Sequence, residues 1–407
     1  MKHGRKSLLH ALQAETESSR NLSRPNGNSE TMQQHQPNNF DFVRLLAASM
    51  VLCSHQFALT GRPEPRPFNL INLGTLGVLI FFSVSGYLVA QSWDRDPHIL
   101  RFTAKRLLRV WPGLAVVTCL AALLLGPAIT QQPMHDYFRS PITWDYFSQL
   151  YFSTRLYLPG VFDHNTWHVV NGSLWTIPIE MRWYGILLVA GLCGLLRKRV
   201  RFLLLGMVLI YAVYIYGVYD VQHNPRAKFP FSDVGIEFGS FFAQGVVLYH
   251  FRDSWQRHPL LLPGALGLSA AVLIGLDHGY AALYLVLPML VIWFGNSSMP
   301  VLRRCGRFGD FSYGIYIYAF LVQQLLVYAM GPNLPYWLGV VISATCTLVC
   351  AVLSWHLVER PALDLKYRLS GARRAADDQS DALSVPQPFV HTATDHPGVV
   401  VYTDRQS

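Results

Sequence analysis

Residues 41–59 read DFVRLLAASMVLCSHQFAL, an apolar run in which Arg44 and His55 stand among aliphatic and aromatic side chains. A helix of about 20 residues crosses the hydrocarbon core of a bilayer. A charged side chain at the centre of such a helix costs about 2.5–3.5 kcal/mol on insertion scales, so it is a candidate for function. The run predicts a membrane-spanning helix that carries functional groups.

Composition extends this prediction to most of the chain. Of 407 residues, 51% are hydrophobic and 14% are charged, whereas an ordinary soluble domain has about 25% charged residues. Aromatic residues make up 13%, which suits two interfacial belts. We predict an all-α, polytopic integral membrane protein with about ten transmembrane helices, near residues 41–59, 71–92, 107–129, 174–196, 202–219, 231–250, 259–276, 280–295, 311–330 and 336–357.

Both ends of the chain differ from this core. Residues 1–38 and 369–407 are polar and lack long aliphatic runs, so they cannot bury enough surface to offset the entropy of ordering. We predict a disordered cytoplasmic leader, a membrane domain at 39–368 and a disordered cytoplasmic tail. No apolar stretch near the start is typical of a cleavable signal peptide.

The basic residues predict the orientation. The formal net charge is +9, and 25 of the 33 Lys and Arg residues fall in the two ends and in alternate loops, on the side that we assign to the cytoplasm. Positive residues concentrate on the cytoplasmic side of membrane proteins. The expected location is therefore the cell inner membrane, with both termini in the cytoplasm. The lipid bilayer is the expected partner, and nucleic acid is not.

Arg44 and His55 are eleven residues apart, which is about three helical turns and about 16 Å. At roughly 100° per residue they return to nearly the same helix face, so both can line one channel. Arg44 then lies near the cytoplasmic end, where it can hold a donor phosphate, and His55 lies deeper, where an imidazole can take a proton from a hydroxyl. Alternatively, Arg44 snorkels to the interface and His55 is a hydrogen-bonded core histidine.

Two further motifs follow along the chain. Ser85 and Gly86 lie in the second predicted span, where small residues allow helices to pack closely. This packing role is the favoured interpretation of the two residues, ahead of a direct part in the chemistry. Arg106 and Arg109 recur at i, i+3 near the cytoplasmic end of the third span. Two guanidinium groups on one helix face suit the phosphates of a nucleotide-type donor, although a role in orientation alone would also explain them.

Glu180, near the start of the fourth span, is the leading candidate for a catalytic carboxylate. A carboxylate in a membrane must be neutral, paired or facing water. Glu180 can orient His55, pair with Arg182 or bind the acceptor. Asp163, His164 and His168 do not form a metal-site pattern, and we expect no metal. The Trp355 to Pro361 stretch is interpreted as an interfacial anchor.

Five places in the sequence resemble integral-membrane acyltransferase family 3, whose members O-acylate surface and exported saccharides, including lipopolysaccharide, exopolysaccharides and nodulation factors. The resemblance covers residues 39–368. The order and placement of the five motifs on the predicted spans make it specific. They are Arg44 with His55, the Phe81-Phe82-x-x-Ser85-Gly86-Tyr87 stretch, Arg106-x-x-Arg109, Ser173-Leu174-Trp175 with Glu180 and Tyr184, and Ser312 to Tyr316 with Glu359-Arg360-Pro361.

The resemblance implies transfer of an acyl group, expected to be acetyl, from cytoplasmic acyl-CoA to a hydroxyl of a saccharide or glycolipid, without a bound cofactor. It implies the following roles: His55 as catalytic base or acyl relay, Glu180 in support of the reaction centre, Arg44, Arg106 and Arg109 in donor binding, and Ser85, Gly86, Ser173, Trp175 and Tyr313 as supporting residues.

Many relatives have a histidine shortly after the tyrosines of the ninth span, where this chain has Ala319 after Tyr318. A saccharide or anion transporter is the alternative, because buried charges and a basic cytoplasmic face would serve either class.

Overall fold

The computed structural model describes residues 38–196, 206 and 234–365, and within these residues the fold is helical without strands. The predicted tail, the predicted leader up to residue 37 and the fifth predicted span, apart from Gly206, lie outside the described residues. The main helices are α2 (Phe40–Leu59), α3 (Leu73–Arg95), α4 (Ile99–Cys119), α5 (Gly126–Ile129), α6 (Met134–Arg139), α7 (Pro141–Asp145), α8 (Ile177–Leu192), α10 (Val234–His250), α11 (Arg252–Arg257), α12 (Leu261–Gly275), α13 (Gly279–Asn296), α14 (Ser312–Met330) and α15 (Tyr336–Ser354).

Short helical segments connect or extend these helices. Two of them are π-helical, Leu120–Leu125 after α4 and Trp355–Glu359 after α15. The others are 3₁₀ turns at Pro67–Asn69, Tyr146–Tyr151, Gly172–Thr176 and Leu302–Phe308.

The apolar runs coincide with helices wherever the structure describes them. Six helical segments in the described part of the chain are long and apolar enough to cross a membrane, judged by length and composition: Phe40–Leu59, Leu73–Arg95, Ile99–Ile129, Gly279–Asn296, Ser312–Met330 and Tyr336–Leu365. Helices α8, α10 and α12 are shorter, with 16, 17 and 15 residues. The all-α, polytopic membrane fold is thus confirmed, and the total of ten spans stays a prediction.

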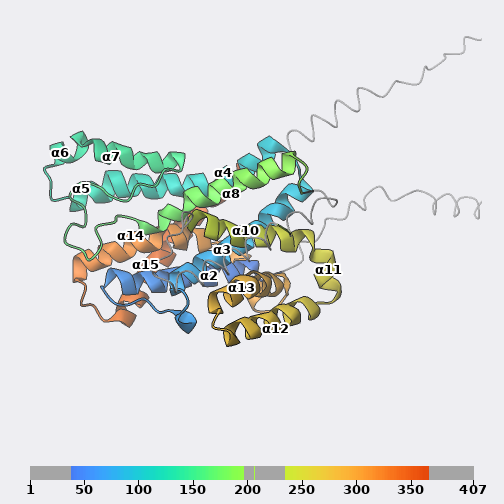
Figure 1. Ribbon diagram of the computed structural model, residues 1–407. Helices are drawn as coiled ribbons and strands as arrows, with labels where there is room; N and C mark the ends of the chain where they lie inside the picture. The colour runs from blue at the N-terminus through green and yellow to red at the C-terminus, as the bar shows by residue number, and fades with distance from the viewer. Residues whose placement is uncertain (1–37, 197–205, 207–233, 366–407) are drawn as a thin grey trace, which may run out of the picture.

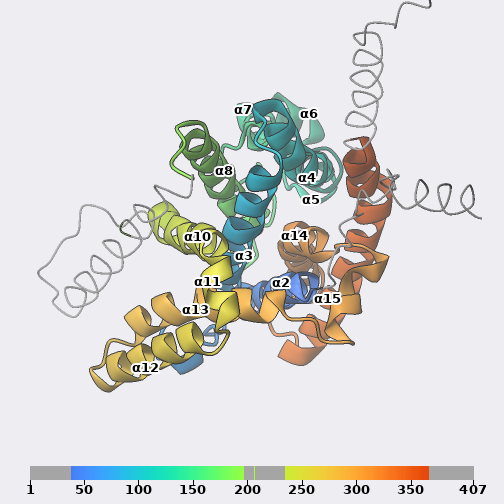
Figure 2. The same ribbon diagram turned by 90° about the vertical axis from the view of Figure 1, so that its right-hand side faces the viewer.

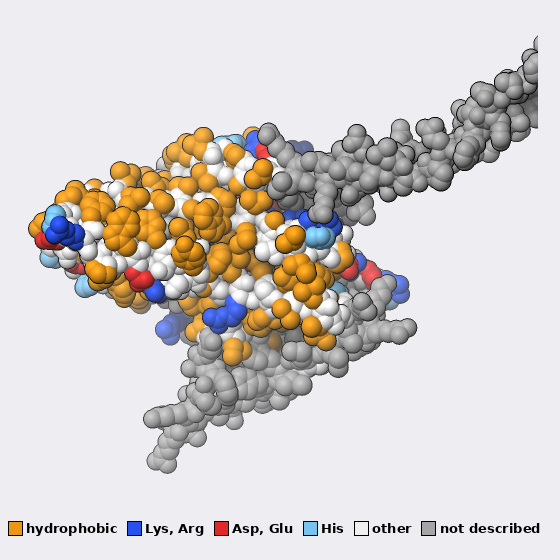
Figure 3. All heavy atoms as spheres, turned by 90° about the horizontal axis from the view of Figure 1, so that it is seen from above, with side chains coloured by type: hydrophobic (Ala, Val, Ile, Leu, Met, Phe, Trp, Pro, Cys, Tyr) orange, Lys and Arg blue, Asp and Glu red, His pale blue; other side chains and the backbone are white. Residues whose placement is uncertain are grey.

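Helix α3 lies near the centre of the bundle, with α2 and α10 as its main neighbours (Figure 2). Helices α4 to α8 lie on one side of this centre, and α12 and α13 lie on the other (Figure 1). Apolar side chains cover most of the flank formed by the α4 to α8 side, with charged side chains mainly toward its ends (Figure 3). Such a surface suits contact with lipid, because large apolar patches are rare on soluble monomers.

Helices α3 and α10 approach closely because glycines lie at their contact. A Cβ on Gly86 would overlap the backbone carbonyl oxygen of Phe242, and a Cβ on Gly245 would overlap that of Ser83. Small residues permit such backbone contacts between membrane helices. The expectation that Gly86 serves helix packing therefore agrees with the structure.

We predict that Gly86→Ala lowers the stability of the detergent-solubilised protein by about 1–3 kcal/mol, because the new methyl group meets backbone that cannot move aside cheaply. Gly185→Ala is the matched control, since Gly185 lies in α8 and a Cβ added there would have no other atom within 4 Å. Alanine there should be neutral or slightly stabilising. Thermal unfolding of both variants checks this, and equal stabilities would contradict the close α3–α10 contact.

Candidate active site

A cavity of about 120 Å³, which we call the arginine cavity, lies among α2, α3, α4, α8 and α14. Its lining includes three arginines on two helices, Arg44 from α2 and Arg106 and Arg109 from α4. Ser85, Glu180 and Tyr313 also line it. Six of the side chains that the sequence singled out therefore meet in one place.

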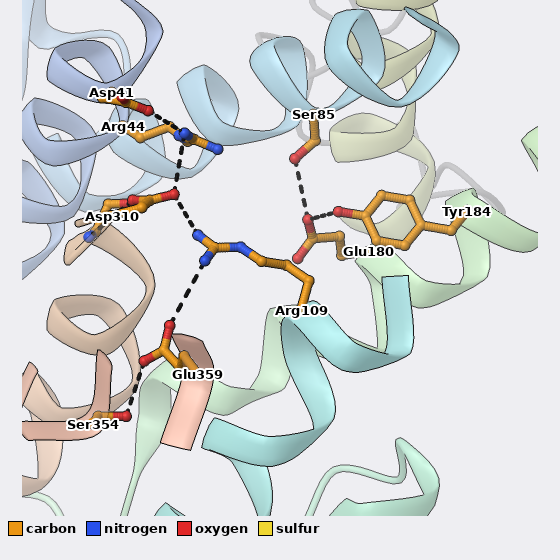
Figure 4. Close-up of polar contacts among 10 residues, drawn as sticks. Asp41, Arg44, Ser85, Arg109, Glu180, Tyr184, Asp310, Ser354 and Glu359 are labelled. Carbon is orange, nitrogen blue, oxygen red and sulfur yellow. Dashed lines mark hydrogen bonds and ion pairs between the residues drawn. The ribbon is translucent and has the colours of Figure 1, made fainter. Parts of the chain in front are cut away.

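Asp310 links two of the three arginines. Its Oδ2 lies 2.5 Å from Nη2 of Arg109 and 3.1 Å from Nη2 of Arg44 (Figure 4). Arg44 also contacts Asp41 one turn earlier in α2, at 2.5 Å. One carboxylate thereby fixes guanidinium groups from α2 and α4 beside the cavity, an arrangement that sequence reasoning missed.

The chain before α14 is shaped to place Asp310 there. Gly309 has φ +136°, and a Cβ on it would overlap the indole nitrogen of Trp355, so only glycine fits without movement. Ser312 donates a hydrogen bond to Oδ1 of Asp310 at 2.5 Å. Burial by itself would raise the pKa of Asp310, but Arg109, Arg44 and the bonds from Ser312 lower it below its usual range. Asp310 therefore stays ionised at neutral pH.

Glu359 completes the network from the other side. Its side chain is 1% exposed, with Oε2 3.7 Å from Nη1 of Arg109 and Oε1 accepting a hydrogen bond from Ser354 at 2.9 Å. It ends the π segment that extends α15, and such segments often occur at functional sites. The interpretation of this stretch as an interfacial anchor is wrong for Glu359, which is a buried ion-pair partner.

Arg106 differs from the other two arginines of the cavity. Among the described residues, no carboxylate lies within ion-pair distance of it. Its guanidinium carbon lies 5.7 Å from the ring centre of Phe102 and 5.8 Å from that of Tyr184, and its Nε is buried without a hydrogen-bond partner. Cations are held over aromatic faces in this way. Arg106 thus forms no direct ion pair among the described residues, and Glu180 on the cavity wall is the carboxylate that acts on its charge from a distance.

Glu180 lies on the wall of the arginine cavity, apart from His55. Its Oε1 accepts hydrogen bonds from Ser85, at 3.1 Å, and from the hydroxyl of Tyr184 (Figure 4). Arg182, the alternative partner, has an exposed side chain. The bond from Ser85 also shows that this serine contacts the site and does not serve helix packing alone.

His55 lines a second cavity of about 270 Å³, which we call the histidine cavity. Ser173 and Trp175, both expected to be supporting residues, line it as well, together with Glu64. The imidazole packs against the ring of Phe320 at 5.0 Å between ring centres, and its Nδ1 is buried without a hydrogen-bond partner. His55 therefore faces a cavity with one nitrogen still unsatisfied.

The two cavities follow each other along the bundle and share two lining residues, Val78 and Tyr316. The hydroxyl of Tyr316 lies 2.5 Å from Oγ1 of Thr176, and its ring packs edge-on against Phe81. Arg44 and His55 thus lie on one continuous helix and face two neighbouring cavities that meet at these shared residues. The sequence predicted a single channel, whereas the structure has two compartments.

Glu64 was not identified from the sequence, because it lies in a Pro-rich loop outside the predicted spans. Asp310 was missed for a similar reason, since it lies between two helices. No group of three His, Cys, Asp or Glu side chains suited to a metal ion was found among the described residues, Asp163, His164 and His168 included.

Comparison with known proteins gives the family. Residues 38–356 match the family model described as an acyltransferase domain. An O-acetyl transferase of Shigella phage Sf6 is 32% identical over 334 residues, which cover 80% of this chain and 96% of that protein. Nodulation protein 10 of Rhizobium leguminosarum bv. viciae is 31% identical over 369 residues, covering 83% and 96%. No solved structure matches the chain.

The family model covers the helices that form both cavities, from α2 to α14. Together with the apolar helices, this match identifies a multi-pass membrane enzyme and favours the enzyme over the transporter that the sequence also allowed. The chain belongs to integral-membrane acyltransferase family 3 and is an O-acyltransferase.

Proposed function

We propose that this protein transfers an acyl group, acetyl in the first instance, from acyl-CoA to a hydroxyl of an envelope or exported saccharide. The observation that carries the proposal is the pair of adjoining cavities with different chemistry. One is lined by three arginines, and the other by His55 without any lysine or arginine among its described lining residues. An anionic donor suits the first cavity and an uncharged polyol suits the second.

The arginine cavity would hold the donor. Guanidinium groups bind phosphate through paired, charge-assisted hydrogen bonds. At about 120 Å³ the cavity is smaller than the roughly 300 Å³ at which small-molecule sites begin, so it would take the diphosphate of acyl-CoA with the adjoining part of its arm, while the adenosine lies outside. The Glu180 carboxylate, which lies among these arginines, would accept hydrogen bonds from amide N–H groups in the arm of acyl-CoA.

His55 would act at the acceptor. In the overall reaction the acceptor oxygen forms an ester bond with the carbonyl carbon, the bond from that carbon to the thioester sulfur breaks, and the hydroxyl proton ends on the released thiol. His55 lines the histidine cavity, and an imidazole ring nitrogen can accept a proton from a hydroxyl placed beside it. The acyl end of the donor would pass the shared residues Val78 and Tyr316 to meet the acceptor. The balance holds whether transfer is direct or proceeds through an acyl relay.

The orientation follows from the positive residues. The arginine cavity lies toward the end of the bundle where α2, α4 and α14 begin, and the Lys and Arg residues of 95–109 and 303–307 flank that end in the sequence. By the positive-inside rule this end faces the cytoplasm. Acyl-CoA would then enter from the cytoplasm across the inner membrane, and both chain termini would lie on the same side.

The test is acyl transfer itself. Membranes from a host that expresses the protein, incubated with acyl-labelled acetyl-CoA, should gain alkali-labile label in the envelope saccharides, and membranes from the host without the gene should not. The acetyl transferase activity named for the phage relative motivates the choice of acetyl. Equal labelling of the two membrane preparations would overturn the proposed function.

A further inference from the structure

Glu64 is held in the wall of the histidine cavity. It lies in the loop between α2 and α3, between Pro63 and Pro65, which restrict the backbone on both sides. Its Oε2 accepts a hydrogen bond from Ser54, whose side chain is fully buried in α2 one residue before His55. The carboxylate and the imidazole therefore reach the cavity from neighbouring points of one helix and its loop.

The charge of this cavity is one-sided. Glu64 carries the one carboxylate among the described residues that line the cavity, and these residues include no lysine or arginine that could neutralise it. Two other polar atoms of lining residues, Nδ1 of His55 and Oγ of Ser173, are buried without hydrogen-bond partners. Buried polar groups normally have a partner, so these atoms point to a polar molecule that enters the cavity.

Aromatic rings at the cavity supply the remaining part of a saccharide site. Trp167 and Trp175 line it and are 50% and 36% exposed, which leaves ring surface free. An aromatic face packs against the C–H face of a sugar ring, while a few placed polar groups orient its hydroxyls, as in other small-molecule sites.

We propose that Glu64 is an acceptor-binding residue that accepts a hydrogen bond from a second hydroxyl of the sugar whose reacting hydroxyl faces His55. The inference rests on the proposed function and adds the acceptor class. With a fixed negative charge and no lining cation, the cavity selects uncharged sugar residues and disfavours acidic ones, since an unpaired anion beside Glu64 would be repelled in a half-buried site.

Glu64→Gln tests the role in binding. The variant keeps the shape of the side chain but removes its negative charge, which weakens the hydrogen bond that it accepts from the sugar. The kcat/KM for the saccharide should therefore fall about 10-fold. The KM for acetyl-CoA should stay the same, because Glu64 does not line the arginine cavity. Glu64→Asp should recover part of the loss. Asp163→Asn is the matched control, as it neutralises an exposed carboxylate that does not line the cavity.

The selectivity is tested by product mapping in a host whose envelope glycans contain both uncharged and acidic sugars. Wild-type esters should lie on uncharged sugars, and Glu64→Gln should raise the share on acidic ones. Wild-type esters on acidic sugars, or unchanged acceptor kinetics in Glu64→Gln, would overturn the inference while leaving the acyltransferase function intact. A wild type that forms no ester would instead overturn the proposed function, and the inference with it.

Discussion

Replacing His55 by alanine is expected to lower ester formation on saccharides by about 10²- to 10⁴-fold, the usual contribution of general acid–base catalysis. His55 lines the histidine cavity with an unpartnered Nδ1, so its loss removes the group placed to take a proton from the acceptor. The readout is labelled acyl transfer in membranes that contain equal amounts of wild-type and variant protein. Binding of acyl-CoA should change little, because the arginine cavity is left intact.

His168→Ala is the matched control for this prediction. His168 belongs to the segment that precedes α8, but its side chain is exposed and does not line the cavity. Its replacement should leave transfer unchanged, which separates loss of a base from loss of any imidazole. If His55→Ala retained wild-type transfer at equal protein level, His55 would have no part in the mechanism.

The sequence predicted well whatever depends on one helix. Apolar runs predicted the helices, because backbone N–H and C=O groups in lipid must form their hydrogen bonds within the helix. The spacing of Arg44 and His55 was enough to place both on α2 with their side chains directed into the bundle. Along a single helix, periodicity alone relates two side chains.

The sequence predicted poorly what depends on loops and on the packing of one helix against another. Asp310 lies 201 residues after Arg109, and nothing in the sequence indicates that the two side chains are in contact. Glu64 reaches the His55 cavity from a loop, and its contact with Ser54 appears only in three dimensions. Glu180 was a candidate to orient His55, but the way α8 packs directs it to Ser85 on α3.

Arg106→Gln is expected to weaken acyl-CoA binding without destabilising the protein. A hydrogen bond to a charged group contributes about 1.5–3 kcal/mol, so the Kd should rise about 10- to 100-fold. Stability should change little, because Arg106 forms no direct ion pair with a carboxylate of the described residues, and its replacement therefore breaks none. The measurements are equilibrium binding of labelled acetyl-CoA and thermal unfolding in detergent. Arg106→Lys, which keeps the charge but not the planar fork, should bind with intermediate affinity.

Arg109→Gln provides the comparison, because the same change on the same helix has a different physical consequence. It removes the ion-pair partner of the buried Glu359 and leaves Asp310 with Arg44 alone, and breaking a buried ion pair costs about 3–5 kcal/mol. Arg109→Gln should therefore lose stability and donor binding together, whereas Arg101→Gln, which removes an exposed α4 arginine outside the cavity, should lose little of either.

The binding defect of Arg106→Gln should be largest at low salt, where charges are least screened. Wild-type affinity in Arg106→Gln at every salt concentration would show that this arginine serves only the orientation of the protein in the membrane.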